Sequence, residues 1–407
     1  MAESLAPRTD IAELIDDSSV PPAAMVRLAT GRLYWPGLLL ALATTSIAIG
    51  IIWDISWHIS IGRDTFWTPA HLAIHFGGIL GGCVGGWLAF RYTFLAREEG
   101  RTSSVGILGA RAPLGAWVTI WGAVAMITSA PFDDWWHNAY GVDVKIISPP
   151  HVLLGLGMLG INLGALLLGL SHQNRANDAP GDWLFAYIGG IFLTLGSVFV
   201  MEYSTPNLQH TAVFYEICAG TFTIRLVTLA VAGRISWPAS RAAAVYLVLQ
   251  GFMTWILPLF PAHPKLAPIF HPVTHMVPPA FPLLLIFPAL AIDVLLRKTG
   301  ADWSGWRRVA LSFALGVAFV AVFLAVQWFF AEFLLTPAAD NWFFAGNRYW
   351  GYDSAPGGWA QKFWCVTAGG PNFYPLTGTA ILACWAIAAG GAWLGLLWGG
   401  WMKKVLR

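Results

Sequence analysis

The sequence predicts an all-α polytopic membrane protein with about ten transmembrane helices. Three observations support this fold class: hydrophobic residues make up 57% of the 407 residues, charged residues only 11%, and 23 residues are tryptophan. Soluble domains carry about 25% charged residues, so this low charge content excludes an ordinary cytosolic enzyme. Tryptophan is enriched at membrane–water interfaces, and the apolar composition excludes intrinsic disorder.

Ten segments are apolar over roughly the 20 residues that a helix needs to cross the hydrocarbon layer. They cover residues 33–53, 68–91, 113–132, 149–171, 183–204, 212–232, 241–260, 276–296, 309–335 and 377–402. The sixth segment contains Arg225, and a cation inside a membrane normally faces a partner or a polar cavity. Pairing with Glu202 or Glu216 is one prediction, and a pathway for protons or substrate is the alternative.

The basic residues predict the orientation of the chain. With the N-terminus in the cytoplasm, 17 Lys and Arg fall on the cytosolic side and five on the outer side, as the positive-inside rule requires. Ten spans then place both termini in the cytosol, and we expect the inner (plasma) membrane of a bacterium. The first 32 residues are polar without an apolar core, so they are expected to form a cytosolic tail.

Two classes of partner or site find no support in the composition. The four cysteines include no CxxC pair, which argues against a disulfide framework or a thiolate metal site. The net charge of +2 gives no reason to expect nucleic acid as a partner. Membrane lipids are the partners that the apolar spans require.

Nine of the ten histidines fall on the outer side or within about a turn of it. They are His58, His71, His75, His137, His151, His210, His263, His271 and His275. Only His172 lies on the cytosolic side. Histidines placed merely as interfacial residues would divide evenly between the two sides, so the distribution favours a function at the outer face.

One pattern, D-x-x-W-H followed by G-x-D and then by [S/T]-P-x-H, occurs twice in the outer segments. The first copy runs from Asp54 to His71 and the second from Asp133 to His151. Each copy joins the end of one predicted span to the start of the next. A duplicated helix pair explains this arrangement, and internal repeats are common in membrane folds.

The spacing predicts a metal site in each copy. An Asp and a His four residues apart lie on one face of a helix, and the Pro-x-His begins the next helix, so its His faces back toward them. The first predicted ligand set is Asp54, His58 and His71, and the second is Asp133, His137 and His151. Two imidazoles and one carboxylate leave open metal positions, which suits dioxygen, water or substrate. These ligand types also fit iron or zinc.

Other residues near the outer face could support these sites. Trp57 and Trp136 are expected to anchor or pack, and Asp64 and Asp143 to cap the returning helix or orient a histidine. His75 is an alternate ligand, a proton relay or a core histidine. The remaining candidates are Asp134, Glu202, His210, His263, His271 and His275. The last three resemble a decayed third copy that lacks the aspartate.

The chain divides into five regions. They are a cytosolic tail (1–32), the duplicated metal-binding region (33–175), further transmembrane helices (176–335), an outer segment (336–376), and the last transmembrane helix with a basic cytosolic tail (377–407). The outer segment is rich in aromatic residues and is expected to form a cap on the membrane. The cap would serve as a structural belt or as a substrate lid.

Residues 35–175 resemble the third subunit of the copper membrane monooxygenases, the family of particulate methane monooxygenase and ammonia monooxygenase. The resemblance rests on Ser56-Trp57-His58 and on Arg63-Asp64-Thr65-Phe66-Trp67-Thr68-Pro69-Ala70-His71. In the family this context carries an Asp-x3-His-x12-His copper set, which matches Asp54, His58 and His71. The second copper set of the family is Asn-x3-His-x13-His, and here Asp133 replaces the asparagine and adds a negative charge.

The resemblance implies copper as the cofactor and oxidation of a small apolar substrate or ammonia by dioxygen. It also implies other monooxygenase-type subunits or a homo-oligomer as partners. The chain has more predicted spans than the family's third subunit, and residues 176–407 match no part of the family. Two alternatives therefore stay open: a copper binding or transfer protein without redox turnover, and an electron-transfer membrane subunit that uses haem or quinol.

Overall fold

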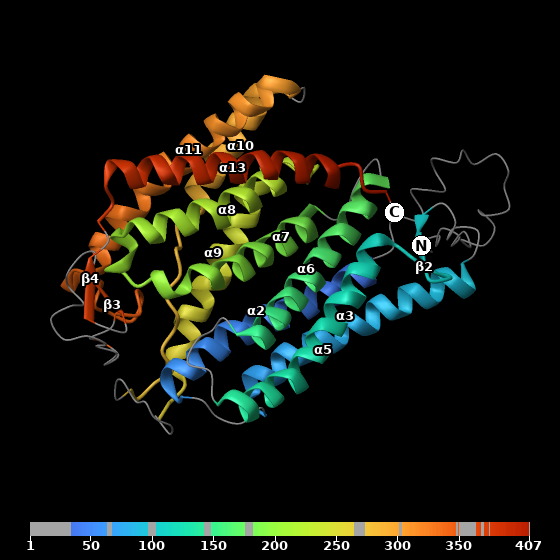
Figure 1. The fold of residues 1–407 in the computed structure, drawn as a ribbon, viewed down its shortest axis with the longest axis horizontal. Helices are drawn as coiled ribbons and strands as arrows, with labels where there is room; N and C mark the ends of the chain where they lie inside the picture. Colours follow the sequence, from blue (N-terminus) through green and yellow to red (C-terminus); the bar gives the residue numbers. More distant parts are fainter. Residues whose placement is uncertain are drawn as a thin grey trace, which may run out of the picture.

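The computed structural model describes residues 34–62, 67–96, 103–141, 148–175, 182–263, 273–300, 303–346, 349, 364–367, 370–373 and 375–406. The predicted N-terminal tail lies outside these residues, as do Asp64, Asp143, His271 and much of the predicted outer cap. The described residues form a bundle of long helices (Figure 1).

The helices follow the predicted spans closely. They are α2 (Trp35–Ser60), α3 (Pro69–Phe90), α5 (Leu114–Tyr140), α6 (Pro149–Arg175), α7 (Asp182–Ser197), α8 (Ala212–Ala232), α9 (Pro238–Ile256), α10 (Ile286–Thr299), α11 (Gly305–Leu334) and α13 (Gly378–Met402). Among the described residues, nine helices are long and apolar enough to cross a membrane. The predicted all-α polytopic membrane class is therefore confirmed.

Short elements extend or connect these helices. A π-helical turn, η1 (Arg91–Leu95), follows α3, and four 3₁₀ turns are η2 (Val198–Tyr203), η3 (Leu208–His210), η4 (Leu257–Leu259) and η5 (Pro337–Ala339). Two antiparallel hairpins, β1 (Val105–Ile107) with β2 (Ala110–Ala112) and β3 (Trp364–Thr367) with β4 (Gly370–Phe373), lie in connections. The second hairpin falls in the segment expected to form the cap.

The bundle has two ends, which we name by what lies there. The end where α2 and α5 finish and α3 and α6 begin is the triad face, because it carries both predicted ligand sets. The other end is the opposite face, where α2 begins and α13 finishes (Figure 1). Here the Asn174 side-chain amide donates to the backbone carbonyls of Met402 (3.3 Å) and Val405 (2.8 Å).

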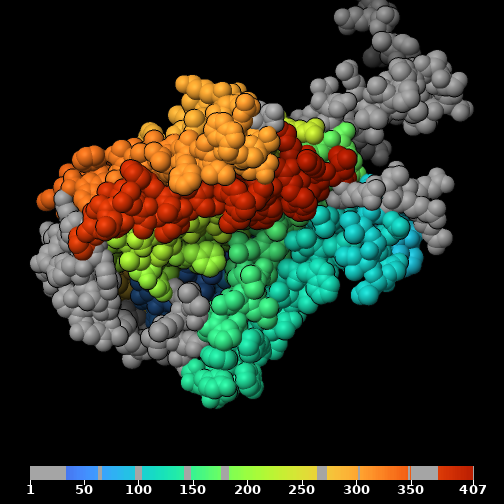
Figure 2. All heavy atoms as spheres, turned by 45° about the horizontal axis from the view of Figure 1, so that its top comes forward, coloured from blue at the N-terminus to red at the C-terminus, as the bar shows by residue number. Residues whose placement is uncertain are grey.

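Glycine allows the two helix pairs of the repeat to pack closely. A Cβ on Gly50 of α2 would lie 2.7 Å from Ile74 Cγ1 of α3, and one on Gly122 of α5 would lie 2.6 Å from the Ile161 nitrogen of α6. Real Cβ atoms do not approach so closely, so a larger residue would separate each pair. Beyond the repeat, α13 runs along α8 and α11 (Figure 2).

The predicted span 276–296 is helical only from Ile286. The helix α10 has 14 residues and is about 21 Å long, which is short of the roughly 30 Å hydrocarbon layer. Pro278, Pro279 and Pro282 precede it, and proline lacks the N–H that a helix interior requires. The prediction of a full helix over 276–296 is therefore wrong for its first ten residues.

The non-helical stretch nevertheless completes the crossing. Near the triad face, Val277 N donates to Ser60 Oγ at the end of α2 (2.7 Å). At the opposite face, Asp293 of α10 accepts hydrogen bonds from the backbone nitrogens of Ala239 (3.3 Å) and Ser240 (2.8 Å) at the start of α9. Non-helical backbone is tolerated at membrane depth only where protein surrounds it and satisfies its polar groups, or where it lines a water-filled cavity.

Two buried side chains make hydrogen bonds to this stretch, and a third buried side chain bonds to one of them. Gln327 Oε1 accepts from Leu284 N (3.3 Å), and Tyr246 donates its hydroxyl to the Pro282 carbonyl (2.8 Å). Gln327 also donates to Gln209 Oε1 (2.7 Å). Polar side chains from α9 and α11 thus replace part of the hydrogen bonding that a continuous helix would have made within itself.

Candidate metal centre

The local sequence fixes where each predicted ligand lies. Asp54 and His58 occupy successive turns at the end of α2, and His71 lies in the first turn of α3. Thr68 is the N-cap of α3, and its side chain accepts a hydrogen bond from the backbone nitrogen of His71 (3.2 Å). Because an N-cap fixes the direction of a helix start, Thr68 also sets the direction from which His71 approaches Asp54.

The second copy has the same local construction. Ser148 Oγ accepts from the backbone nitrogen of His151 (3.4 Å) at the start of α6. The Ser or Thr of the repeated pattern thus caps the returning helix in both copies. The sequence pattern predicts this role for Asp64 and Asp143. Both aspartates lie outside the described residues.

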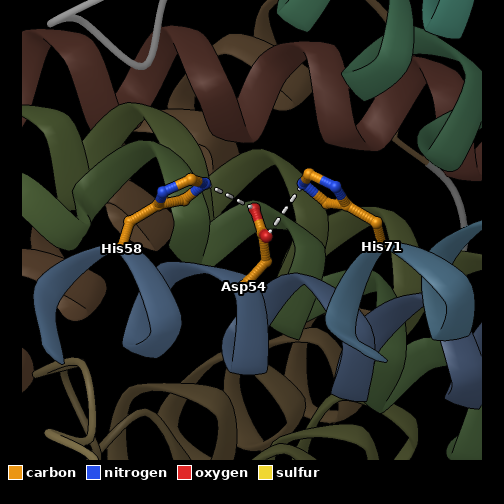
Figure 3. A group of neighbouring side chains, drawn as sticks. All are labelled: Asp54, His58 and His71. Atoms are coloured by element: carbon orange, nitrogen blue, oxygen red, sulfur yellow. Dashed lines mark ion pairs between the residues drawn. The ribbon is translucent and has the colours of Figure 1, made fainter. Parts of the chain in front are cut away.

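The first triad brings its three side chains together. His71 Nε2 lies 3.0 Å from Asp54 Oδ1, and His58 Nε2 lies 3.6 Å from Asp54 Oδ2. Figure 3 shows the two imidazoles pointing at the carboxylate from opposite sides. Among the described residues, this is the one group of three His, Cys, Asp or Glu whose donor atoms all lie within 4.8 Å of one another.

The 3.0 Å separation fits a transition metal, and the 3.6 Å separation is slightly longer than expected. Metal–ligand bonds of about 2.0–2.2 Å at angles of about 90–110° place neighbouring donor atoms about 3.0–3.5 Å apart. In addition, no N–H or O–H of the described residues makes a well-directed hydrogen bond to the buried Asp54 Oδ1. A buried carboxylate oxygen without a hydrogen-bond donor, with two imidazole nitrogens near the carboxylate, suits a cation bound among the three side chains.

The first triad lies at the boundary between core and solvent. The Asp54 side chain is 13% exposed, His71 is 25% exposed and His58 is 39% exposed. The carboxylate is therefore sheltered, while one imidazole is open to the surface.

The second triad is more open. His137 Nε2 and His151 Nε2 lie 3.6 Å and 3.5 Å from the same oxygen, Asp133 Oδ1. The three do not form a group with all donor atoms within 4.8 Å, so the two imidazoles stand farther apart than in the first triad. Pro131 lies inside α5 two residues before Asp133, where α2 has Ile52, and a proline distorts the surrounding helical turn.

The two pattern tryptophans pack in different surroundings. Trp57 packs against the apolar cluster that includes Met253 and Met276, next to the stretch that contacts the end of α2. Trp136 lies in an aromatic group at the end of α5, with its ring centroid 4.5 Å from that of Tyr140. Both tryptophans pack at the ends of the helices that carry the predicted ligands.

Other candidate residues lie outside the two triads. His75 is one turn beyond His71 along α3 and is half-buried. Asp134 is exposed, and its backbone carbonyl accepts from Asn138 Nδ2 (2.9 Å). Glu202 is exposed at the end of η2.

The histidines of the C-terminal half are held by local structure. His210 is fully buried, with Nδ1 3.1 Å from the Pro206 carbonyl and its ring edge-on to Trp328. His275 bridges to Pro261 in an antiparallel pairing, and its Nδ1 lies 2.9 Å from Thr274 Oγ1. His263 follows this pairing, and His271 lies outside the described residues. In the described part of the chain these histidines form no third triad.

Comparison with known proteins gives no relative. No protein-family model matches the chain, and neither a curated protein nor a solved structure matches it. A function for this chain therefore has to be inferred from the geometry of its two triads and from its sequence.

Proposed function

We propose that this membrane protein binds copper at Asp54, His58 and His71 and uses it to oxidise a small apolar substrate or ammonia with dioxygen. The observation that supports this proposal is the convergence of three donor atoms within 4.8 Å at the first triad. The choice of copper follows from the resemblance of this segment to the third subunit of the copper membrane monooxygenases. Copper bound there would supply the activation of dioxygen.

The protein residues would have distinct parts in this activity. Asp54 would hold both imidazoles in place and offset the charge of the metal, because its two oxygens face His71 and His58 separately. The exposed side of His58 would leave coordination positions open toward the triad face. Asp133, His137 and His151 would bind a second copper, more weakly because the site is less compact.

Copper binding or transfer without redox turnover is the second candidate function. It is favoured by the 39% exposure of His58, since an accessible ligand permits rapid exchange of metal. It needs the same six ligands and no substrate site. In either case we propose that the triad face is the outer face of a bacterial inner membrane, and that further subunits or a second copy assemble with the chain.

Metal analysis tests the shared part of both functions. The full chain, purified in detergent and loaded with copper, is expected to retain one or two coppers per chain by mass spectrometry. His58→Ala should lose the first copper and His137→Ala the second. Iron or zinc in place of copper, or copper unchanged in both variants, would refute the assignment.

Oxygen uptake separates the two functions. Copper-loaded membranes supplied with a reductant should consume dioxygen faster when ammonia or a small alkane is added. His58→Ala combined with His137→Ala should abolish that increase. Bound copper that exchanges quickly with a chelator, with no substrate-dependent uptake, would select the transfer function.

A further inference from the structure

Arg225 lies deep in the bundle, on α8. Its Cα is seven residues from the end of α8 at the opposite face, about 10 Å along the axis. Its Nη1 donates to the Thr221 carbonyl one turn back toward the triad face (2.7 Å). The guanidinium therefore lies near the middle of a hydrocarbon layer about 30 Å thick, instead of reaching the nearer interface as basic side chains usually do.

No carboxylate of the described residues pairs with this cation. The predicted pairs with Glu216 and Glu202 are not formed, so that prediction is wrong. The guanidinium donates to the Thr221 carbonyl and faces the Phe192 ring, whose centroid is 5.1 Å from Cζ. Its Nε is buried and makes no hydrogen bond to the described residues.

A glycine of α7, Gly196, makes room for the guanidinium of Arg225. A Cβ on Gly196 of α7 would lie 2.6 Å from Arg225 Nε, so the absence of a side chain there lets the guanidinium lie against α7. On its other side Phe192 is edge-on to Trp398 of α13 (centroids 6.0 Å apart). Arg225 as a whole is only partly buried, so a bound molecule can contact part of its side chain.

We propose that Arg225 binds the carboxylate of a fatty-acid-like amphiphile that enters from the membrane. A cation in apolar surroundings strongly favours an anionic partner, and a guanidinium offers two parallel donors that match a carboxylate. The depth of the site favours an anion on an aliphatic chain, since such a molecule can leave its tail in the lipid beside the partly exposed Trp398. This site is separate from the two triads.

Palmitate is the probe for this proposal. The full chain in phosphatidylcholine nanodiscs is titrated with palmitate, and bound ligand is counted by native mass spectrometry beside the shift in thermal unfolding temperature. The wild type should bind one palmitate per chain and become more stable. Arg225→Met should bind it about 10- to 100-fold more weakly, the loss expected for charged hydrogen bonds.

Two further variants separate a ligand site from a structural effect. Gly196→Ala keeps the charge but displaces the guanidinium, and it should also weaken palmitate binding. Arg241→Met is the matched control, because Arg241 is an exposed arginine of α9 whose guanidinium donates to Ser236 Oγ (2.8 Å). This control should bind palmitate like the wild type.

Three results would overturn the proposal. The first is palmitate binding that is the same in Arg225→Met and wild type. The second is a wild type that binds none and is less stable than Arg225→Met, as expected of an unpaired buried charge replaced by an apolar side chain. The third is Arg225-dependent stabilisation by phosphatidylglycerol but not by palmitate, which would assign the site to a phospholipid headgroup.

Discussion

Replacing Asp54 by asparagine should weaken copper binding at the first triad by about a thousandfold. The substitution keeps the size of the side chain and removes one negative charge. A Cu²⁺ ion and a carboxylate oxygen about 2.1 Å apart attract each other by about 4 kcal/mol even at the dielectric constant of water. Asp54 is 13% exposed, so its attraction to the metal is larger than in water. When the carboxylate is removed, water can coordinate the metal and offset part of the lost attraction. About 4 kcal/mol corresponds to roughly a thousandfold in affinity.

The assay is a competition titration with a chelator of known copper affinity, with electron paramagnetic resonance to report the nitrogen ligands. Glu202→Gln is the control, because it removes a carboxylate that lies outside both triads and is exposed. Unchanged thermal unfolding of the metal-free Asp54→Asn variant would show that the fold is intact. If the copper affinity of Asp54→Asn lies within about threefold of the wild-type affinity, the metal assignment of the first triad is refuted. A threefold change in affinity is smaller than the tenfold change that about 1.4 kcal/mol represents.

Further predictions concern the supports of the site and the broken crossing. Thr68→Val removes the N-cap of α3 and should lower the free energy of unfolding by about 1 kcal/mol and also lower copper affinity. Ser148→Ala should have the same two effects at the second site. Unchanged copper affinity in Thr68→Val would contradict a positioning role for Thr68. Gln327→Leu leaves Leu284 N without its acceptor and should lower stability by about 1–3 kcal/mol in thermal unfolding while copper content stays constant. Because imidazole must be deprotonated to bind metal, acidification should release copper, measured by dialysis at stepped pH, and copper retained unchanged at about pH 4 would contradict ligation by histidine.

The sequence predicts the first triad because its geometry is local. An Asp and a His four residues apart share a helix face whatever the rest of the fold does, and the capped Pro-x-His start turns one helix back beside another. The same pattern does not predict how compact each copy is. Pro131 distinguishes the second copy from the first, yet its effect on Asp133 depends on how the helix bends within the bundle.

The errors of prediction arise where distant packing decides. Hydropathy over 276–296 counts apolar side chains and ignores the missing N–H groups of Pro278, Pro279 and Pro282, although the sequence displays these prolines. The partners of the extended backbone, Ser60, Tyr246 and Gln327, lie 36 to 217 residues away. The isolation of Arg225 from Glu216 and Glu202 likewise depends on the rotation of α8, for which the sequence holds no local signal.

The contact between Ser60 and Val277 limits how the chain can be divided. It joins the helix that carries Asp54 and His58 to a stretch 217 residues later, while Asn174 fastens the end of α6 to the C-terminus of the chain. The duplicated helix pairs are thus not a detachable cassette. Grafting residues 33–175 into another protein would transplant all six proposed metal ligands without the two contacts that join their helices to the rest of the chain. A shortened version of this protein made to test copper binding would therefore need the later helices as well.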